Sequence, residues 1–242
     1  MILATNGIIQ SKSAAAPVAD DIIQTGLILN LNTRNPLSYT GVYSPWKDLT
    51  SNANNAVSTT GIAYDSTLQA FFFDGADDFF TFGTTNFPTG KADISFGMWV
   101  NTGTIPAQQN LLLHYGNFNN DPQSILIWYQ HDNKTFNVVW AANNYISTST
   151  NFGALSTWYN VSMVYSATTS NLKFYINGNL IGTSGTFNYN LPAVPDKKSL
   201  GGPYYPINLA RMYMARAYFY NTALSATDVM TNFTNTKGGF GL

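Results

Sequence analysis

The sequence predicts an all-β fold, a sandwich of two antiparallel sheets with one short helix near the C-terminus. Short runs rich in aromatic and β-branched residues recur along the chain, with turn-forming residues between them. Asn177 and Gly178 separate two apolar runs, which is typical of a type I′ hairpin because both positions readily take positive φ. Since only one segment is convincingly helical, the pattern favours a β-sandwich.

The predicted strands begin just after Gly26, where leucines alternate with other residues from Leu27 to Leu31. A turn rich in Gly and Asp then separates two phenylalanine-rich strands. The helix is predicted from Leu224 onward, because Ser225 is a capping residue and Asp228 follows three positions later. The further strands are predicted at residues 70–73, 79–82, 94–100, 111–115, 125–130, 136–140, 158–165, 172–176 and 212–220.

The composition excludes several partners. Among 242 residues, 11 are Lys or Arg and 12 are Asp or Glu, so the net charge is −1. A nucleic-acid binder needs a basic face, and an anionic membrane attracts a polybasic one, so neither partner is expected. Cysteine is absent, which excludes disulfides and thiolate sites. No apolar run approaches the roughly 20 residues that span a bilayer.

Residues 1–22 differ from the rest and are predicted to be an N-terminal arm, followed by one domain at 23–242. The arm lacks the basic region and long apolar stretch of a signal peptide, so synthesis in a cytoplasm is expected. It has no core of its own, and we interpret it as an arm that docks onto a neighbouring subunit; a disordered tail is the alternative. Its partner-binding residues would be Ile2, Leu3, Ile8 and Ile9.

Several motifs, in the same order along the chain, resemble the concanavalin A-like, laminin-G-like (LamG) jelly-roll domains. Phe73–Phe79 is similar to the family's "FDGxDDY" turn, and Ile94–Val100 to its "FTISAWV" strand. The resemblance extends over about residues 22–242 and implies a jelly-roll sandwich of two antiparallel sheets. The other matching segments are Gly26–Leu31, Asn35–Tyr39, Trp46–Asn52, Trp158–Val161, Lys173–Gly178 and Ala217–Ser225.

The last segment, Asp228–Leu242, is similar to the ending of LamG-like virion structural proteins of phages and large DNA viruses. That resemblance implies a non-enzymatic virion protein, such as a capsid decoration, head-fibre or minor capsid or tail component. Its expected partners are other virion proteins, namely the major capsid protein or copies of itself, and host surface glycans. The expected location is the virion, with the extracellular space or cell surface as the alternative.

Catalysis is disfavoured by the acidic residues. Glycoside hydrolases of this fold normally use two Glu on one strand, and every acidic residue here is Asp. No pair of Asp lies close together in a predicted central strand, and no nucleophile elbow is present. His114 and His131 each lack a nearby acidic run or second His. The chain is therefore predicted not to be an enzyme, with a glycoside hydrolase as the remote alternative.

The one acidic cluster, Asp74, Asp77 and Asp78, falls in the turn that supplies Ca²⁺ ligands in pentraxin-like relatives. Ca²⁺ takes 6–8 oxygen ligands, and the other expected ligand segments lack carboxylates here. We therefore favour a structural reading, in which the Asp side chains accept backbone N–H bonds and tie the turn together. No cofactor is expected, with Ca²⁺ as the alternative.

The aromatic residues divide into core and loop positions. Phe71, Phe73, Trp99, Trp128 and Phe174 are predicted to lie in the core, and Trp46 to be a packing residue. Aromatics in predicted loops suit sugar stacking or protein interfaces. A carbohydrate-binding lectin-like module or adhesin is therefore the main alternative function. The candidate glycan or interface residues are Tyr43, Tyr145, Tyr204 and Tyr205.

Overall fold

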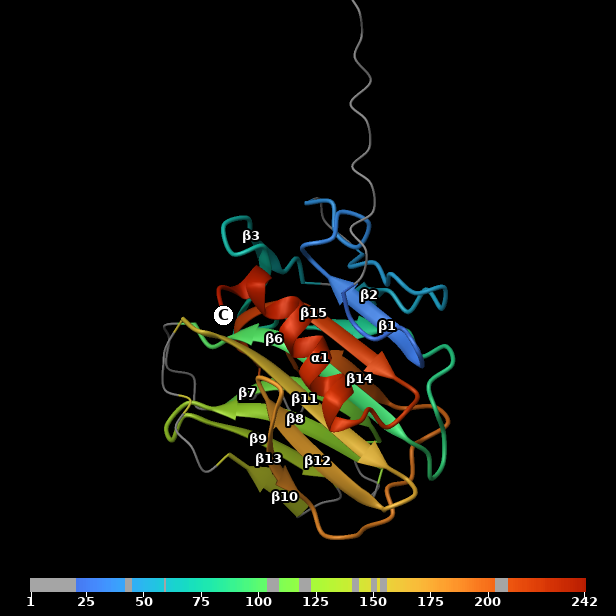
Figure 1. The fold of residues 1–242 in the computed structure, drawn as a ribbon. Helices are drawn as coiled ribbons and strands as arrows, with labels where there is room; N and C mark the ends of the chain where they lie inside the picture. Colours follow the sequence, from blue (N-terminus) through green and yellow to red (C-terminus); the bar gives the residue numbers. More distant parts are fainter. Residues whose placement is uncertain are drawn as a thin grey trace, which may run out of the picture.

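A computed structural model shows two packed antiparallel sheets and one helix (Figure 1). These two sheets confirm the predicted sandwich. No helix in the described part of the chain is long and apolar enough to cross a membrane. The structure describes residues 21–41, 45–58, 60–103, 109–117, 123–140, 144–148, 152, 156–202 and 209–242, and for residues 109, 140, 144 and 145 it describes only the backbone.

The first sheet has eight strands, ordered β13-β12-β11-β6-β15-β4-β3, with β1 also paired to β15. β15 is long enough for two partners on one side: β4 pairs with its first half and β1 with its second half. The bounds are β1 Leu27–Asn32, β3 Ala63–Asp65, β4 Ala70–Asp74, β6 Ile94–Asn101, β11 Trp158–Ser166, β12 Asn171–Ile176, β13 Asn179–Thr183 and β15 Arg211–Tyr220.

The second sheet has seven strands, ordered β10-β9-β8-β7-β14-β5-β2. All its pairs are antiparallel, and the β7–β8 ladder has a bulge between Leu111 and Leu113. The bounds are β2 Ala56–Val57, β5 Phe80–Phe82, β7 Gln109–Gly116, β8 Ser124–Gln130, β9 Thr135–Trp140, β10 Asn144–Ser147 and β14 Lys197–Leu200.

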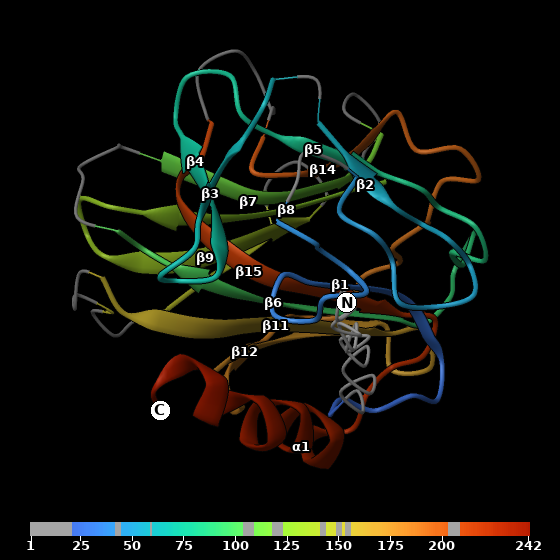
Figure 2. The ribbon, with the colours of Figure 1, turned by 90° about the horizontal axis from the view of Figure 1, so that it is seen from above.

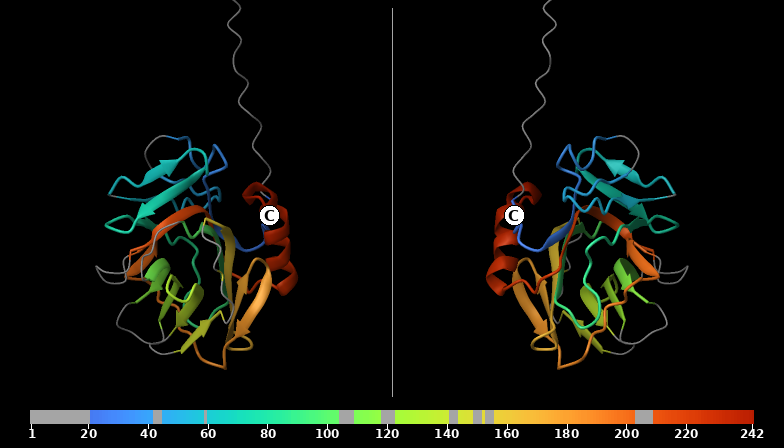
Figure 3. Two further views of the ribbon diagram at one scale, coloured as in Figure 1. Left: turned by 90° about the vertical axis from the view of Figure 1, so that its left-hand side faces the viewer. Right: turned by 90° about the vertical axis from the view of Figure 1, so that its right-hand side faces the viewer.

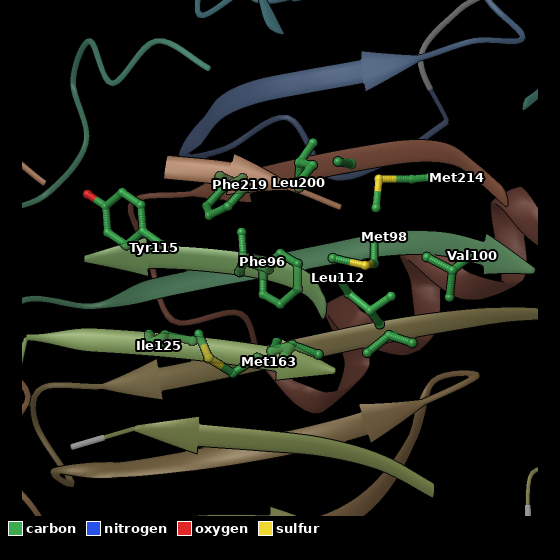
Figure 4. Close-up of a cluster of buried hydrophobic side chains, with 14 of the residues drawn as sticks. Phe96, Met98, Val100, Leu112, Tyr115, Ile125, Met163, Leu200, Met214 and Phe219 are labelled. Carbon is green, nitrogen blue, oxygen red and sulfur yellow. The ribbon is translucent and has the colours of Figure 1, made fainter. Parts of the chain in front are cut away.

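The main hydrophobic core fills the space between the two sheets. Figure 4 shows Phe96, Met98 and Phe219 of the first sheet facing Leu112 and Leu200 of the second. These side chains are at most 1% exposed. Their alternation along each strand follows from the two-residue repeat of β-structure, which directs every second side chain to the interior.

The outer face of the eight-stranded sheet is covered by the C-terminal segment. Helix α1 (Ala226–Thr236) and the 3-10 helix η2 (Lys237–Phe240) lie across it (Figure 2). The predicted cap is confirmed: the Ser225 side chain accepts from the Asp228 N–H, and the Asp228 carboxylate accepts from the Ser225 N–H. Two small clusters hold this layer, one around Tyr220 and Val229 and one around Trp99 and Phe240.

Two local details bear on the predictions. Asn177 and Gly178 have φ of 51° and 76°, and they connect β12 to β13 as the predicted tight turn.

Asp21 and Ile22, assigned above to the arm, instead pack on the domain. Ile22 is 4% exposed in the cluster under α1. The packed domain therefore begins no later than residue 21, because Ile22 has apolar neighbours there to bury it. The rest of the predicted arm, including Ile2, Leu3, Ile8 and Ile9, lies outside the described residues.

Candidate functional site

The candidate site is the outer face of the seven-stranded sheet. On β8, Ile125, Ile127 and Tyr129 belong to the inter-sheet core, so Leu126 and Trp128 point outward. This face lies on the side of the molecule opposite to α1 (Figure 3). No described helix packs against it, whereas the other sheet's outer face carries α1 and η2. It is thus the sheet face over which no described helix lies.

One row of outward positions crosses almost the whole sheet. Residues directly opposite in antiparallel strands place their Cβ atoms about 4.5–5.5 Å apart. The described register therefore sets small, polar and apolar side chains side by side. From β2 to β9 the row reads Val57, Thr81, Ser199, His114, Leu126 and Val139.

A second row contains Trp128, an aromatic residue whose side chain the structure describes on this face. Trp128 of β8 lies between Leu111 of β7 and Asn137 of β9, and Ser147 of β10 is next to Asn137. Trp128 is half-buried, so part of its indole reaches the surface. The Asn137 amide donates to the Thr135 carbonyl at 3.1 Å, which fixes that side chain beside the ring. The row thus combines an aromatic surface with oriented polar groups.

The middle of this face is shielded. His114 is 0% exposed, and Leu111 and Ser199 are each 2% exposed, although none of them belongs to the inter-sheet core. His114 Nε2 lies 3.2 Å from Ser124 Oγ, which orients the imidazole along the sheet. The Ser199 hydroxyl has no hydrogen-bond partner among the described residues. A buried hydroxyl usually has such a partner, so Ser199 is a polar group with bonding capacity left on this face.

The charge on the face limits its chemistry. Lys197 of β14 is the only charged side chain among the described outward positions, and none of them is a carboxylate. Glycoside hydrolysis ordinarily needs two carboxyl groups about 5–5.5 Å apart in retaining enzymes, or about 6.5–9.5 Å apart in inverting ones. These positions do not supply that pair. They do supply the aromatic and neutral hydrogen-bonding groups that bind sugars without reacting with them.

The acidic cluster lies in a different place, in the turn between β4 and β5. The carboxylate oxygens of Asp74, Asp77 and Asp78 lie within 4.8 Å of one another. Asp74 Oδ1 accepts from the Ala76 N–H at 2.7 Å, and Asp78 Oδ2 accepts from the Asp74 N–H at 3.1 Å. These bonds are of the kind expected for a structural turn. A Ca²⁺ ion takes 6–8 oxygens, so it would need carbonyl or water ligands in addition to these carboxylates.

Asp78 is the buried member of this cluster, at 6% exposure. Burial raises the pKa of its carboxyl above the ordinary value, opposed by the hydrogen bond from the Asp74 N–H. The charge of Asp74 raises the pKa further, and the hydrogen bond from Thr60 lowers it. The ionised form of Asp78 is therefore less favourable than that of an exposed carboxyl, and a bound cation would stabilise it.

The aromatic candidates fall mostly outside the described part of the chain. Tyr43, Tyr204 and Tyr205 lie there, and for Tyr145 only the backbone is described, opposite Val139 in the register. Trp46 packs as expected, at 0% exposure and with its ring 5.1 Å from that of Phe71.

Trp128 corrects a prediction. It was expected in the core, but it points outward because β8 alternates two apolar sets, and the set of Ile125 and Ile127 faces the other sheet. Hydrophobicity alone gives no signal to separate these sets. The polar Ser124 and Gln130, which share the parity of Trp128, are the signal that could have identified the outward face.

The antiparallel two-sheet sandwich places this chain in the lectin-like class of folds. The family model for the concanavalin A-like lectin/glucanases superfamily, of laminin-G type, matches residues 74–230. The chain belongs to this superfamily. This confirms the jelly-roll fold inferred from the motifs.

Solved structures support the same fold. A Trypanosoma rangeli sialidase in complex with sialic acid matches with a TM-score of 0.65 and 17% identity over 93% of this chain. The ligand binding domain of botulinum neurotoxin serotype D, in complex with N-acetylneuraminic acid, matches with a TM-score of 0.67 and 12% identity over 86% of this chain. The match spans 36% of the sialidase and 50% of the neurotoxin chain. A search of curated proteins finds no match.

Proposed function

We propose that this protein is a non-catalytic carbohydrate-recognition module that binds glycans on the outer face of the seven-stranded sheet. One observation carries the proposal: this face, over which no described helix lies, combines the partly exposed Trp128 with neutral polar side chains and lacks carboxylates at its described positions. The sialidase and the neurotoxin domain are each solved in complex with a sialic acid, which agrees with carbohydrate binding as a candidate activity.

The geometry suits a sugar ring for physical reasons. The indole of Trp128 offers a flat apolar surface to the C–H face of a pyranose, while the partly exposed Gln130, two residues along β8, carries an amide group for its hydroxyls. Sites of this kind gain specificity from a few fixed polar groups around an apolar contact. Asn137, at 6% exposure, lies opposite Trp128 on β9 and is held by its hydrogen bond to Thr135.

The experiment compares two aromatic truncations on a glycan array. Trp128→Ala is expected to reduce binding at least tenfold, because the indole supplies the apolar surface of the proposed contact. Phe72→Ala is the matched control. Phe72 is also half-buried and stacks on Tyr213, but it belongs to the eight-stranded sheet. It should leave binding unchanged.

Both arrays are run with Ca²⁺ and with a chelator. Binding that is equal in the two conditions agrees with a metal-independent face. Binding that needs Ca²⁺ would show that the glycan binds at a metal centre instead of this face. A folded wild-type protein that binds no glycan, or an unaltered Trp128→Ala variant, would contradict the proposal.

We propose further that the module serves as a structural component of a virion, attached through its N-terminal segment to the major capsid protein or to copies of itself. Two observations support this. The chain enters the domain beside α1, on the side opposite to the candidate glycan face (Figure 3). Charged residues are only 10% of the chain, so little electrostatic repulsion opposes contact.

This second part is tested by mass spectrometry of purified particles. The protein should be present in them, with copies in a fixed ratio to the major capsid protein. Its absence from particles, together with secretion from cells, would favour the extracellular or cell-surface location instead.

A further inference from the structure

The last six residues of the chain are attached to the domain mainly by one side chain. Phe240 is the only buried residue of segment 237–242, which comprises η2 and the two residues after it. The exposed residues of the segment are Gly238, Gly239, Gly241 and Leu242. The attachment of segment 237–242 therefore depends on what surrounds the Phe240 ring.

The Phe240 ring fills a slot formed by Trp99, Trp158 and Arg34. The Trp99 ring is stacked on it with centroids 4.1 Å apart, and the Trp158 ring lies 4.9 Å away at 58°. The Arg34 guanidinium carbon lies 4.3 Å from the Phe240 centroid. Since non-bonded carbon atoms stay about 3.5–4.0 Å apart, the indole of Trp99 and the guanidinium lie on opposite faces of the ring. The slot thus binds an aromatic ring by stacking and by cation–π attraction.

Arg34 also contacts the backbone beside the ring. Its Nη2 donates to the Leu68 carbonyl at 2.9 Å, which fixes the guanidinium on the domain. Its Nη1 donates to the Gly239 carbonyl, one residue before Phe240. A bond from a charged donor is stronger than one between neutral groups. The slot therefore recognises a phenylalanine together with the carbonyl that precedes it.

Two glycines of this segment are not required by the conformation in which they lie. Gly238 and Gly239 do not have positive φ, unlike Gly241 at 75°. A Cβ at Gly238 would meet no atom within 4 Å, and one at Gly239 would meet only the Arg34 guanidinium, at 3.8 Å. Glycine in a helical turn is less favourable than alanine, because it loses more conformational entropy. The two glycines therefore make release of the segment easier than alanines would.

We propose that segment 237–242 is a releasable latch, and that its open slot binds the same segment of a second copy of this chain. The occupant follows from the slot, because Phe240 and the Gly239 carbonyl are the groups that fit it. Each copy carries one segment and one slot, so reciprocal exchange gives a closed two-fold dimer. Each slot is then completed by the Phe240 of the other copy.

The short segment determines how the two copies meet. From Lys237 to Phe240 an extended chain spans at most about 11 Å, so the end of α1 in one copy must lie beside η2 of the other. This contact lies on the α1 side of the molecule, away from the seven-stranded sheet (Figure 3). The exchange therefore leaves the candidate glycan face free, and it stands whether or not Trp128 binds a glycan.

The first experiment empties the slot in the full-length chain. ¹⁵N-labelled Phe240→Ala is titrated with the acetylated peptide of residues 237–242, KGGFGL. The indole N–H resonances of Trp99 and Trp158 should shift saturably. The control peptide KGGAGL should shift them less than a tenth as far at the same concentration. The wild type should need at least tenfold more KGGFGL, because its own Phe240 competes. Absence of KGGFGL binding by the folded variant, or equal shifts with both peptides, would overturn the proposal.

The second experiment detects exchange between copies with the slot unchanged. Leu242 is exposed and the chain has no cysteine, so full-length Leu242→Cys takes a single benzophenone label. Equal parts of ¹⁴N and ¹⁵N protein are irradiated at millimolar concentration. We expect cross-linked pairs that carry both isotopes, and at least a fivefold loss of these pairs when Phe240→Ala is added. Absence of mixed pairs, or an unchanged yield with Phe240→Ala, would contradict the exchange.

Alanine substitutions test the role of the two glycines in the same assay. Gly238→Ala with Gly239→Ala should reduce the mixed pairs at least threefold, because exchange requires this turn to leave the helical conformation that alanine favours. Gly185→Ala is the matched control, since its Cβ would also meet no atom within 4 Å and its φ is not positive. It should leave the yield unchanged. Equal yields in the double variant and the wild type would show that these glycines do not act as a hinge.

Discussion

Tryptophan has a different environment on each of the two outer faces of the sandwich. Under the C-terminal segment, Trp99 stacks on Phe240 with a centroid distance of 4.1 Å and an interplanar angle of 11°. Its indole N–H donates to Thr236 at 2.9 Å, and the side chain is 0% exposed. On the opposite face, Trp128 is half-buried and has no stacked ring among the described residues.

The difference shows that a tryptophan on a sheet surface becomes structural when another layer covers it. Phe240 and Thr236 belong to the last residues of the chain, far in sequence from the strand that carries Trp99. They convert an outer face into a second small core. Where no described helix lies over the sheet, the same side chain stays partly exposed.

The largest expected effect is that of Trp99→Ala. It removes the stacking on Phe240 and leaves the Thr236 hydroxyl without its donor, so the free energy of unfolding should fall by about 3–5 kcal/mol. Trp128→Ala, on the uncovered face, should cost about 1 kcal/mol or less. Urea unfolding of both variants measures the contrast. Equal losses would mean that Trp128 is also a structural residue, and the distinction between the faces would disappear.

An intermediate effect is expected for Asp21→Ala, which tests how firmly the start of the chain is attached to the covered face. Arg216 is 3% exposed and would lose its ion pair with Asp21. Breaking a buried pair costs about 3–5 kcal/mol, but the Asp21 side chain is 44% exposed, so we expect about 1–2 kcal/mol. Thermal unfolding gives the value.

Arg216→Met in the Asp21→Ala background is the control for this prediction. Removal of both charges should recover part of the loss, because no uncompensated charge is left under α1. If the double variant is as unstable as the sum of two independent losses, the pair is not coupled.

The smallest effect concerns Asp78, in the turn that links the two sheets. Its raised pKa means that the native state binds a proton more tightly than the unfolded state. Stability therefore falls as the pH rises through the interval between the unfolded and the native pKa. Asp78→Asn should be slightly more stable than the wild type at pH 7, by about 1 kcal/mol or less. The difference should vanish below pH 3.

The effect of Ca²⁺ on the melting temperature tests whether the turn of Asp78 binds a metal ion. If the turn is held by hydrogen bonds alone, millimolar Ca²⁺ should leave the melting temperature of both proteins unchanged. A rise that occurs in the wild type and is lost in Asp78→Asn would show that the carboxylates bind the ion.

Much of the fold could be predicted from local sequence. The strands that became β4, β6, β11, β12 and β15 were each within two residues of their predicted bounds. Asn177-Gly178 predicted its hairpin because few residues tolerate φ of 51° and 76° in succession. Ser225 and Asp228 predicted the start of α1, because a reciprocal cap involves only neighbouring groups. In each case the physical cause lies within a few residues of the signal.

The candidate site could be predicted only in part, because the side on which Trp128 lies is set by the other sheet. The short strands β2, β3, β10 and β14 were also missed, since strands of two to four residues owe their pairing to long neighbours. By itself, the sequence determined the strand order along the chain, the tight turn, the helix cap and the lack of a Glu–Glu pair. The tertiary structure decided which sheet face the C-terminal helices cover, because burial depends on elements that meet only after the chain has folded.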